Sequence, residues 1–74
     1  MISPGEATLL GTVTEFVDAR GLGEITASTP DATVYPFHCV SIADGSRTIQ
    51  VGVAVSFAVL LKLGLREAAD IRPA

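Results

Sequence analysis

Few side chains in this sequence have chemistry that could act on a substrate, and most of them stand alone. His38 is followed directly by Cys39, and these are the only histidine and the only cysteine in the chain. A histidine titrates near neutral pH and could serve as a proton carrier or a switch. A closed zinc site needs four ligands, and this pair supplies two. We therefore expect a solvent-exposed strand histidine beside a partly buried thiol, with no metal and no cofactor.

Two carboxylates, Glu15 and Glu24, fall on strands that we expect to be adjacent. Such a pair can perform acid–base catalysis when a substrate lies between its members. No nucleophile, metal ligand or second base accompanies it, so we expect two solvated side chains that discourage aggregation or polyanion binding. The run Gly21-Leu22-Gly23 is followed by neither a Lys-Ser/Thr pair nor a helix signal, which excludes a phosphate-binding loop. The sequence thus indicates a protein that is not an enzyme.

The composition fits one small domain whose charge is unfavourable for binding nucleic acid. The chain has 74 residues, 49% of them hydrophobic and 18% charged, and its net charge is −3. High hydrophobicity with few charges argues against disorder, whereas a domain that binds a polyanion is usually basic. The longest apolar run, residues 58–61, is too short to span a membrane, and residues 1–6 lack the features of a secretory signal. We expect a cytoplasmic protein.

Alternation of apolar and polar residues between turn clusters predicts short strands and no helix. Every odd position from Val51 to Leu65 is apolar, which predicts a strand with its large face buried and a turn near residues 62–64. Pro36 cannot donate a ladder hydrogen bond, so its strand must lie at a sheet edge or contain a bulge. A bulge would reverse the alternation, which leaves the direction of Phe37 open. The expected strands are residues 9–16, 21–26 and 34–38, a strand that runs from residue 51 to the turn near residues 62–64, and residues 66–71.

A co-linear series of residues resembles the bacterial cold-shock domain and covers roughly residues 8–73. The resemblance implies an all-β fold over residues 8–74, a five-stranded antiparallel barrel of the oligonucleotide/oligosaccharide-binding (OB) type, after a short flexible segment, residues 1–7. It also implies a set of core positions, namely Val13, Phe16, Ile25, Ile42, Val55, Phe57 and Val59. The matching series is Gly11-Thr12-Val13, Phe16, Arg20-Gly21, Gly23, Ile25-Thr26, His38, Ile42, Asp44-Gly45, Arg47-Thr48-Ile49, Gly52, Val55, Phe57, Val59 and Ala68-Ala69-Asp70-Ile71-Arg72-Pro73.

That family binds single-stranded RNA or DNA by stacking bases on aromatic residues of its first three strands, and this sequence departs at those positions. Of the ring-bearing contact positions, only His38 is kept. Stacking contributes about 1–3 kcal/mol per base, so losing the five rings of the strand positions removes on the order of 5–10 kcal/mol. A micromolar complex has about 8 kcal/mol in total. The replacements are Glu15 at the tryptophan position, Leu22, Glu24, Pro36 and Cys39 at phenylalanine positions, and Ser46 near a loop phenylalanine.

Two functions follow from the resemblance and its departures. The first is a cold-shock-like module that binds single-stranded RNA or DNA weakly and with strong salt dependence. The alternative is a protein-interaction or self-association module on a scaffold that no longer binds nucleic acid. The hairpin leucines could be an exposed contact patch or could pack on the end of the barrel. The candidate nucleic-acid contacts are Arg20, Leu22, His38 and Arg47, and the candidate protein contacts are Leu60, Leu61, Leu63 and Leu65, with Leu22, Pro36 and Phe37 beside them.

Overall fold

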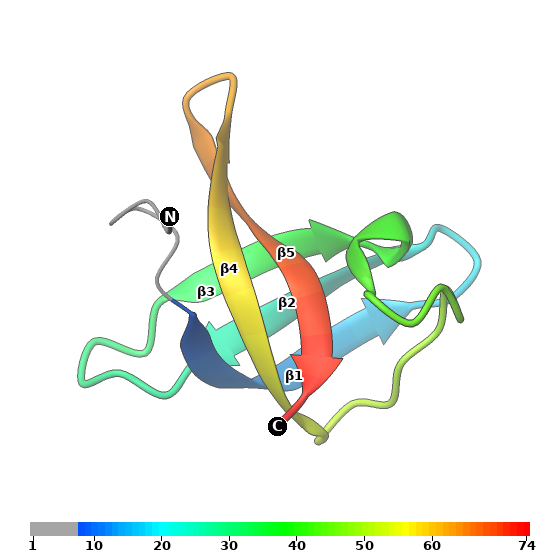
Figure 1. Cartoon of the computed structure of the whole chain (residues 1–74), viewed down its shortest axis with the longest axis horizontal. Helices are drawn as coiled ribbons and strands as arrows, with labels where there is room; N and C mark the ends of the chain where they lie inside the picture. The colour runs from blue at the N-terminus through cyan, green and yellow to red at the C-terminus, as the bar shows by residue number, and fades with distance from the viewer. Residues whose placement is uncertain (1–7) are drawn as a thin grey trace.

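The computed structural model describes residues 8–74, and the predicted flexible segment, residues 1–7, lies outside the described residues. Five strands form a single antiparallel sheet, as the sequence predicts (Figure 1). Their order in the sheet is β3-β2-β1-β4-β5. Within the described range no helix is long and apolar enough to cross a membrane. The elements are β1 Leu9–Val17, β2 Leu22–Ala27, β3 Val34–His38, a short 3₁₀ helix η2 Cys39–Ser41, β4 Ala54–Lys62 and β5 Leu65–Pro73.

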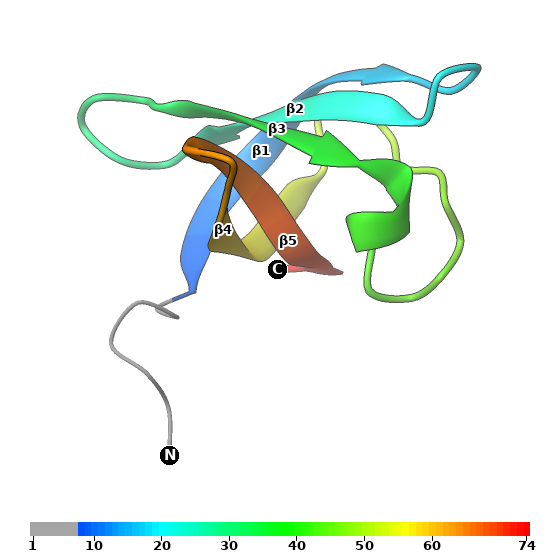
Figure 2. The same cartoon turned by 90° about the horizontal axis from the view of Figure 1, so that it is seen from above.

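The sheet curls, so that β1, β2 and β3 form one layer and β4 and β5 lie beneath it (Figure 2). Among the described residues, the only bridge between the two ends of the sheet is the isolated parallel pair Ile42–Ile71. The backbone N–H of Ala43 donates to the carbonyl of Ile71 at 2.9 Å. No continuous ladder joins β3 to β5, so the sheet is not closed. The architecture is a small, strongly curved, barrel-like sheet.

The core fills the space between the two layers and draws on every strand. Of the seven core positions that the family resemblance implies, five are buried. The other two, Phe16 and Val59, are partly buried and pack against the core, so this prediction is confirmed. The buried hydrophobic residues are Val13, Ile25, Ala27, Tyr35, Phe37, Ile42, Val55, Phe57, Ala68 and Ile71.

The third strand resolves the direction of Phe37. Its register with β2 is unbroken from Leu22–His38 to Thr26–Val34, and it forms one edge of the sheet. The edge alternative for Pro36 is therefore confirmed, and no bulge reverses the alternation. Phe37 faces the core at 2% exposure, whereas Pro36 and His38 face outward.

A β-bulge in β1 decides which of its side chains face the core. The pairing passes from Val13–Ile25 directly to Glu15–Glu24, so Thr14 is the extra residue. A bulge of this kind shifts the side-chain alternation by one. Glu15 is therefore exposed although it lies two residues after the buried Val13, and Phe16 turns inward.

The inward turn of Phe16 brings it onto Phe37 across a glycine. Phe16, Gly23 and Phe37 are consecutive partners across β1, β2 and β3. The two rings stack with centroids 6.0 Å apart and planes 6° apart. A Cβ on Gly23 would lie 2.5 Å from Cζ of Phe37 and 2.6 Å from the backbone oxygen of Glu15. The row therefore requires a residue without a side chain at position 23.

The fourth strand is shorter than the sequence pattern predicts. β4 begins at Ala54, because a turn at Val51 and Gly52 (φ 96°) interrupts the predicted strand. The buried part of the odd series is Val55 and Phe57, whereas Val51 is 59% exposed and Leu61 is 69% exposed. Alternation buries a face only where another layer covers it. Val59, the next member of the series, is partly buried against the core, and Leu61 lies beyond the core.

The turn between β2 and β3 is organised by one carboxylate. The hydroxyl of Thr29 donates to Oδ1 of Asp31 at 2.6 Å, and the hydroxyl of Thr33 donates to Oδ2 at 2.8 Å. These hydrogen bonds, led by that from Thr29, lower the pKa of the Asp31 carboxyl below its ordinary value. The turn thus holds β2 and β3 in register with a charge that stays outside the core.

We predict that Gly23→Ala destabilises the fold by about 3 kcal/mol, because the added methyl group must displace either Phe37 or the backbone of β1. The matched control is Gly45→Ala, where a Cβ meets nothing within 4 Å and only the positive φ of 76° is unfavourable. That control should cost about 1 kcal/mol. Urea unfolding measures both values, and equal losses would contradict the close packing at Gly23.

Candidate binding face

The outer face of β1, β2 and β3, the side turned away from the core, carries the side chains that could contact a ligand. Cross-strand register arranges them in rows. One row is Glu15, Glu24 and Pro36, and the next, toward the β1–β2 turn, is Val17, Leu22 and His38. All six side chains are exposed. The sequence placed Glu15, Leu22, Glu24, Pro36 and His38 on an exposed face, whereas the position of Val17 and the pairing within each row follow only from the register.

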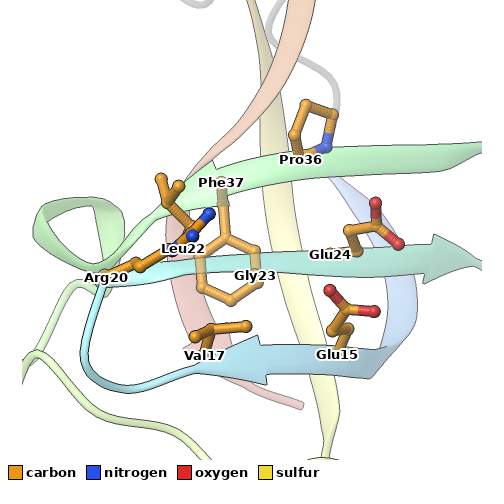
Figure 3. Close-up of a pocket in the computed structure, with 8 residues that line it drawn as sticks. All are labelled: Glu15, Val17, Arg20, Leu22, Gly23, Glu24, Pro36 and Phe37. Carbon is orange, nitrogen blue, oxygen red and sulfur yellow. The ribbon is translucent and has the colours of Figure 1, made fainter.

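A shallow hollow of about 270 Å³ lies over the centre of this face. In Figure 3 the carboxylates of Glu15 and Glu24 stand side by side at one end, and Arg20 lies at the other end beside Leu22. Its remaining walls and floor are mostly apolar, from Val17, Gly23, Pro36 and Phe37. The hollow therefore offers apolar contact between an acidic end and a single guanidinium.

The acidic end carries two like charges in direct cross-strand register. Among the side chains that the structure describes, the only ion pair joins Arg72 to Asp70 at 3.0 Å, on β5. Neither Glu15 nor Glu24 thus has a cationic partner among those side chains. Like charges directly opposite in a sheet destabilise it. The face consequently carries an unfavourable interaction that a cation placed between the two carboxylates would relieve.

Three of the four predicted nucleic-acid contacts lie close together, and the fourth lies in a separate loop. Leu22 pairs with His38 across β2 and β3, and Arg20 lines the same hollow as Leu22. Arg47 lies in the long loop between η2 and β4, with a φ of 61°, and does not line the hollow. Sequence reasoning missed Val17, whose only signal is its register opposite Leu22.

The four predicted hairpin contacts are all exposed, from 42% for Leu60 to 102% for Leu63. The hairpin tip projects beyond the rest of the sheet (Figure 1), so these leucines do not pack on the end of the barrel. They do not form one patch either. Leu61 continues the face of Val55 and Phe57, whereas Leu60 pairs with Glu67 and shares the opposite face with Leu65.

The histidine and the cysteine lie in different surroundings. His38 is exposed at the end of β3, while Cys39 is partly buried in η2. The backbone N–H of Cys39 donates to the carbonyl of Gly21 at 2.7 Å, and the thiol packs where a Cβ on Gly21 would lie. Within residues 8–74, no group of three or more His, Cys, Asp or Glu side chains is placed to hold a metal ion.

Comparison with known proteins adds no relative to this description. The sequence matches none of the protein families and none of the curated proteins with which it was compared.

We predict that replacing either Glu15 or Glu24 by glutamine raises the free energy of unfolding at neutral pH by about 0.5 kcal/mol, because it removes the cross-strand repulsion. The double variant Glu15→Gln/Glu24→Gln should gain less than the sum of the two single gains, because the repulsion can be removed only once. Urea unfolding of the four proteins at low salt measures this coupling. Additive gains, or a coupling that persists in high salt, would contradict direct repulsion.

Proposed function

We propose that this chain is a non-catalytic binding module, an OB barrel of the cold-shock type whose outer face now contacts protein rather than nucleic acid. The coiled five-stranded sheet and the strand order β3-β2-β1-β4-β5 are compatible with such a barrel. The co-linear residue series over residues 8–73 is the further support for this assignment.

The observation that carries the proposal is the Glu15–Glu24 pair. Both carboxylates are exposed in the middle of the face, in direct register, with no cation beside them among the described side chains. A nucleic-acid strand crossing the face would bring its phosphates close to these charges. Repulsion of like charges discriminates against a polyanion, and the net charge of −3 adds to it. A protein ligand meets no such barrier and gains contact with Val17, Leu22 and Pro36.

Self-association through the hairpin is the less favoured form of this function. Leu61 and Leu60 point to opposite faces of the β4–β5 ribbon, so one flat partner surface could cover only one of them. The outer face, in contrast, presents its apolar and charged groups around a single hollow.

Photo-crosslinking tests this proposal. Chemical synthesis can place a diazirine analogue of leucine at position 22 or, as a matched control, at position 63 at the tip of the hairpin. Irradiation in an extract of the source cells should give adducts with protein from position 22 and few from position 63. Diazirine crosslinking captures only close neighbours, and Leu22 is an exposed side chain that lines the hollow.

Adducts at position 22 that nuclease removes would refute the proposal in favour of nucleic acid. Protein adducts confined to position 63 would instead move the interface to the hairpin.

Weak binding of single-stranded nucleic acid is a second candidate function, favoured by one specific observation. Arg20, Leu22 and His38 lie together at the end of the face away from Glu15 and Glu24. A guanidinium can contact a phosphate, and an imidazole ring can stack on a base. The three side chains could hold about one nucleotide, so the complex would be weak.

We predict that a short oligothymidine causes at most small amide shifts in NMR titration at low salt, confined to Leu22, His38 and the β1–β2 turn. Those shifts should disappear as salt is raised, because they depend on few phosphate contacts. Glu15→Trp/Leu22→Phe/Glu24→Phe is the positive control, since it restores three rings to the same backbone and should bind clearly. Tight binding by the native chain would overturn the ranking of the two functions, and no gain by the triple variant would contradict the family assignment.

A further inference from the structure

We infer that the hollow on the outer face accepts a lysine or arginine side chain from a partner protein. This inference rests on the proposed protein-binding function and names the chemistry of the partner. It concerns the hollow lined by Glu15, Glu24, Val17, Leu22 and Pro36 (Figure 3).

The shape and polarity of the hollow match a long cationic side chain. Lysine and arginine have an aliphatic stem that packs along apolar surface and a charged head that seeks polar partners. Val17, Leu22 and Pro36 supply exposed apolar surface, and Glu15 and Glu24 stand at one end of it. A volume of about 270 Å³ leaves room for one such side chain with its neighbouring backbone.

Charge complementarity selects the cation over other occupants. Two carboxylates in direct register offer four acceptor oxygens and no donor, and no described side chain forms an ion pair with them. An ammonium or guanidinium between them would form charge-assisted hydrogen bonds and end their mutual repulsion. A neutral apolar side chain would do neither, and an anionic one would add a third negative charge.

Arg20 makes the two ends of the hollow opposite in charge. It lies at the end away from Glu15 and Glu24, where a second cation would be repelled (Figure 3). A uniformly basic segment is therefore a poorer match than a segment whose single basic residue is flanked by apolar ones. The partner chemistry is a lone lysine or arginine in an apolar surface segment.

Peptide titration tests this inference directly. The probe is the blocked peptide acetyl-Leu-Lys-Leu-Gly-amide, and the control peptide carries glutamine in place of lysine. Amide shifts should map to Glu15, Val17, Leu22 and Glu24 at low salt. The lysine peptide should bind about three- to tenfold more tightly than the glutamine peptide, and the difference should shrink as salt is raised.

Matched variants test whether the preference for lysine depends on the carboxylates of the hollow. Glu24→Gln should abolish most of the preference for lysine, whereas Glu67→Gln, the same chemical change on β5, should leave it intact although both alter the net charge equally. Leu22→Ser should weaken the lysine and glutamine peptides together, because it removes the shared apolar contact. Leu22 and Glu24 are exposed and Glu67 is half-buried, and all three lie outside the core, so the variants should fold, and their amide spectra would show it.

Several outcomes would overturn the inference. These are equal affinity for the two peptides, a lysine preference that survives Glu24→Gln, or tighter binding of oligothymidine than of the lysine peptide on this face. Protein adducts at position 22 without any lysine preference would refute this inference alone. Nuclease-sensitive adducts there would refute the proposed function as well.

Discussion

The stacking of Phe16 on Phe37 across Gly23 is the contact on which the outer face depends. It ties β1, β2 and β3 into one row and keeps two of the three phenylalanine rings on the core side. It is possible only because the bulge at Thr14 shifts the alternation of β1 and because position 23 has no side chain. The same bulge turns Glu15 outward and sets it opposite Glu24. Core packing and the charge of the face are therefore two results of one local irregularity.

The outer face combines two locally unfavourable features. Its acidic end is internally repulsive, and its apolar side chains are exposed around a hollow. The core, in contrast, is internally satisfied, since no buried side-chain polar atom among the described residues lacks a hydrogen-bond partner. Departures from local consistency in an otherwise consistent fold tend to coincide with functional surfaces. This contrast with the core supports the proposal that the face is a binding surface.

In the β4–β5 hairpin the apolar sequence pattern and the observed burial of side chains disagree. The odd-position series from Val51 to Leu65 has the period of a half-buried strand, yet only Val55 and Phe57 are buried. The ladder with β1 ends at the Leu9–Phe57 pair, and the last contact of the ribbon with the core is made by the next pair on that face, Val59 and Ala68. From Leu60 to Leu65 the leucines of the ribbon are exposed. The leucines of this ribbon point to two opposite faces. Although they are close together in the sequence, they do not form one apolar surface.

The sequence by itself determined the number and approximate places of the strands, the core positions from Val13 to Val59 and the exposure of Leu22, Glu24 and His38. These follow from period-two alternation and turn residues, which are local properties, and from a co-linear resemblance. Only the tertiary structure decided that Glu15 stands directly opposite Glu24, that Phe37 lies inside, that Arg47 does not line the hollow, and that the hairpin leucines are uncovered. Each of these depends on register or on where a neighbouring strand ends, and both are set by pairing between segments distant in the chain.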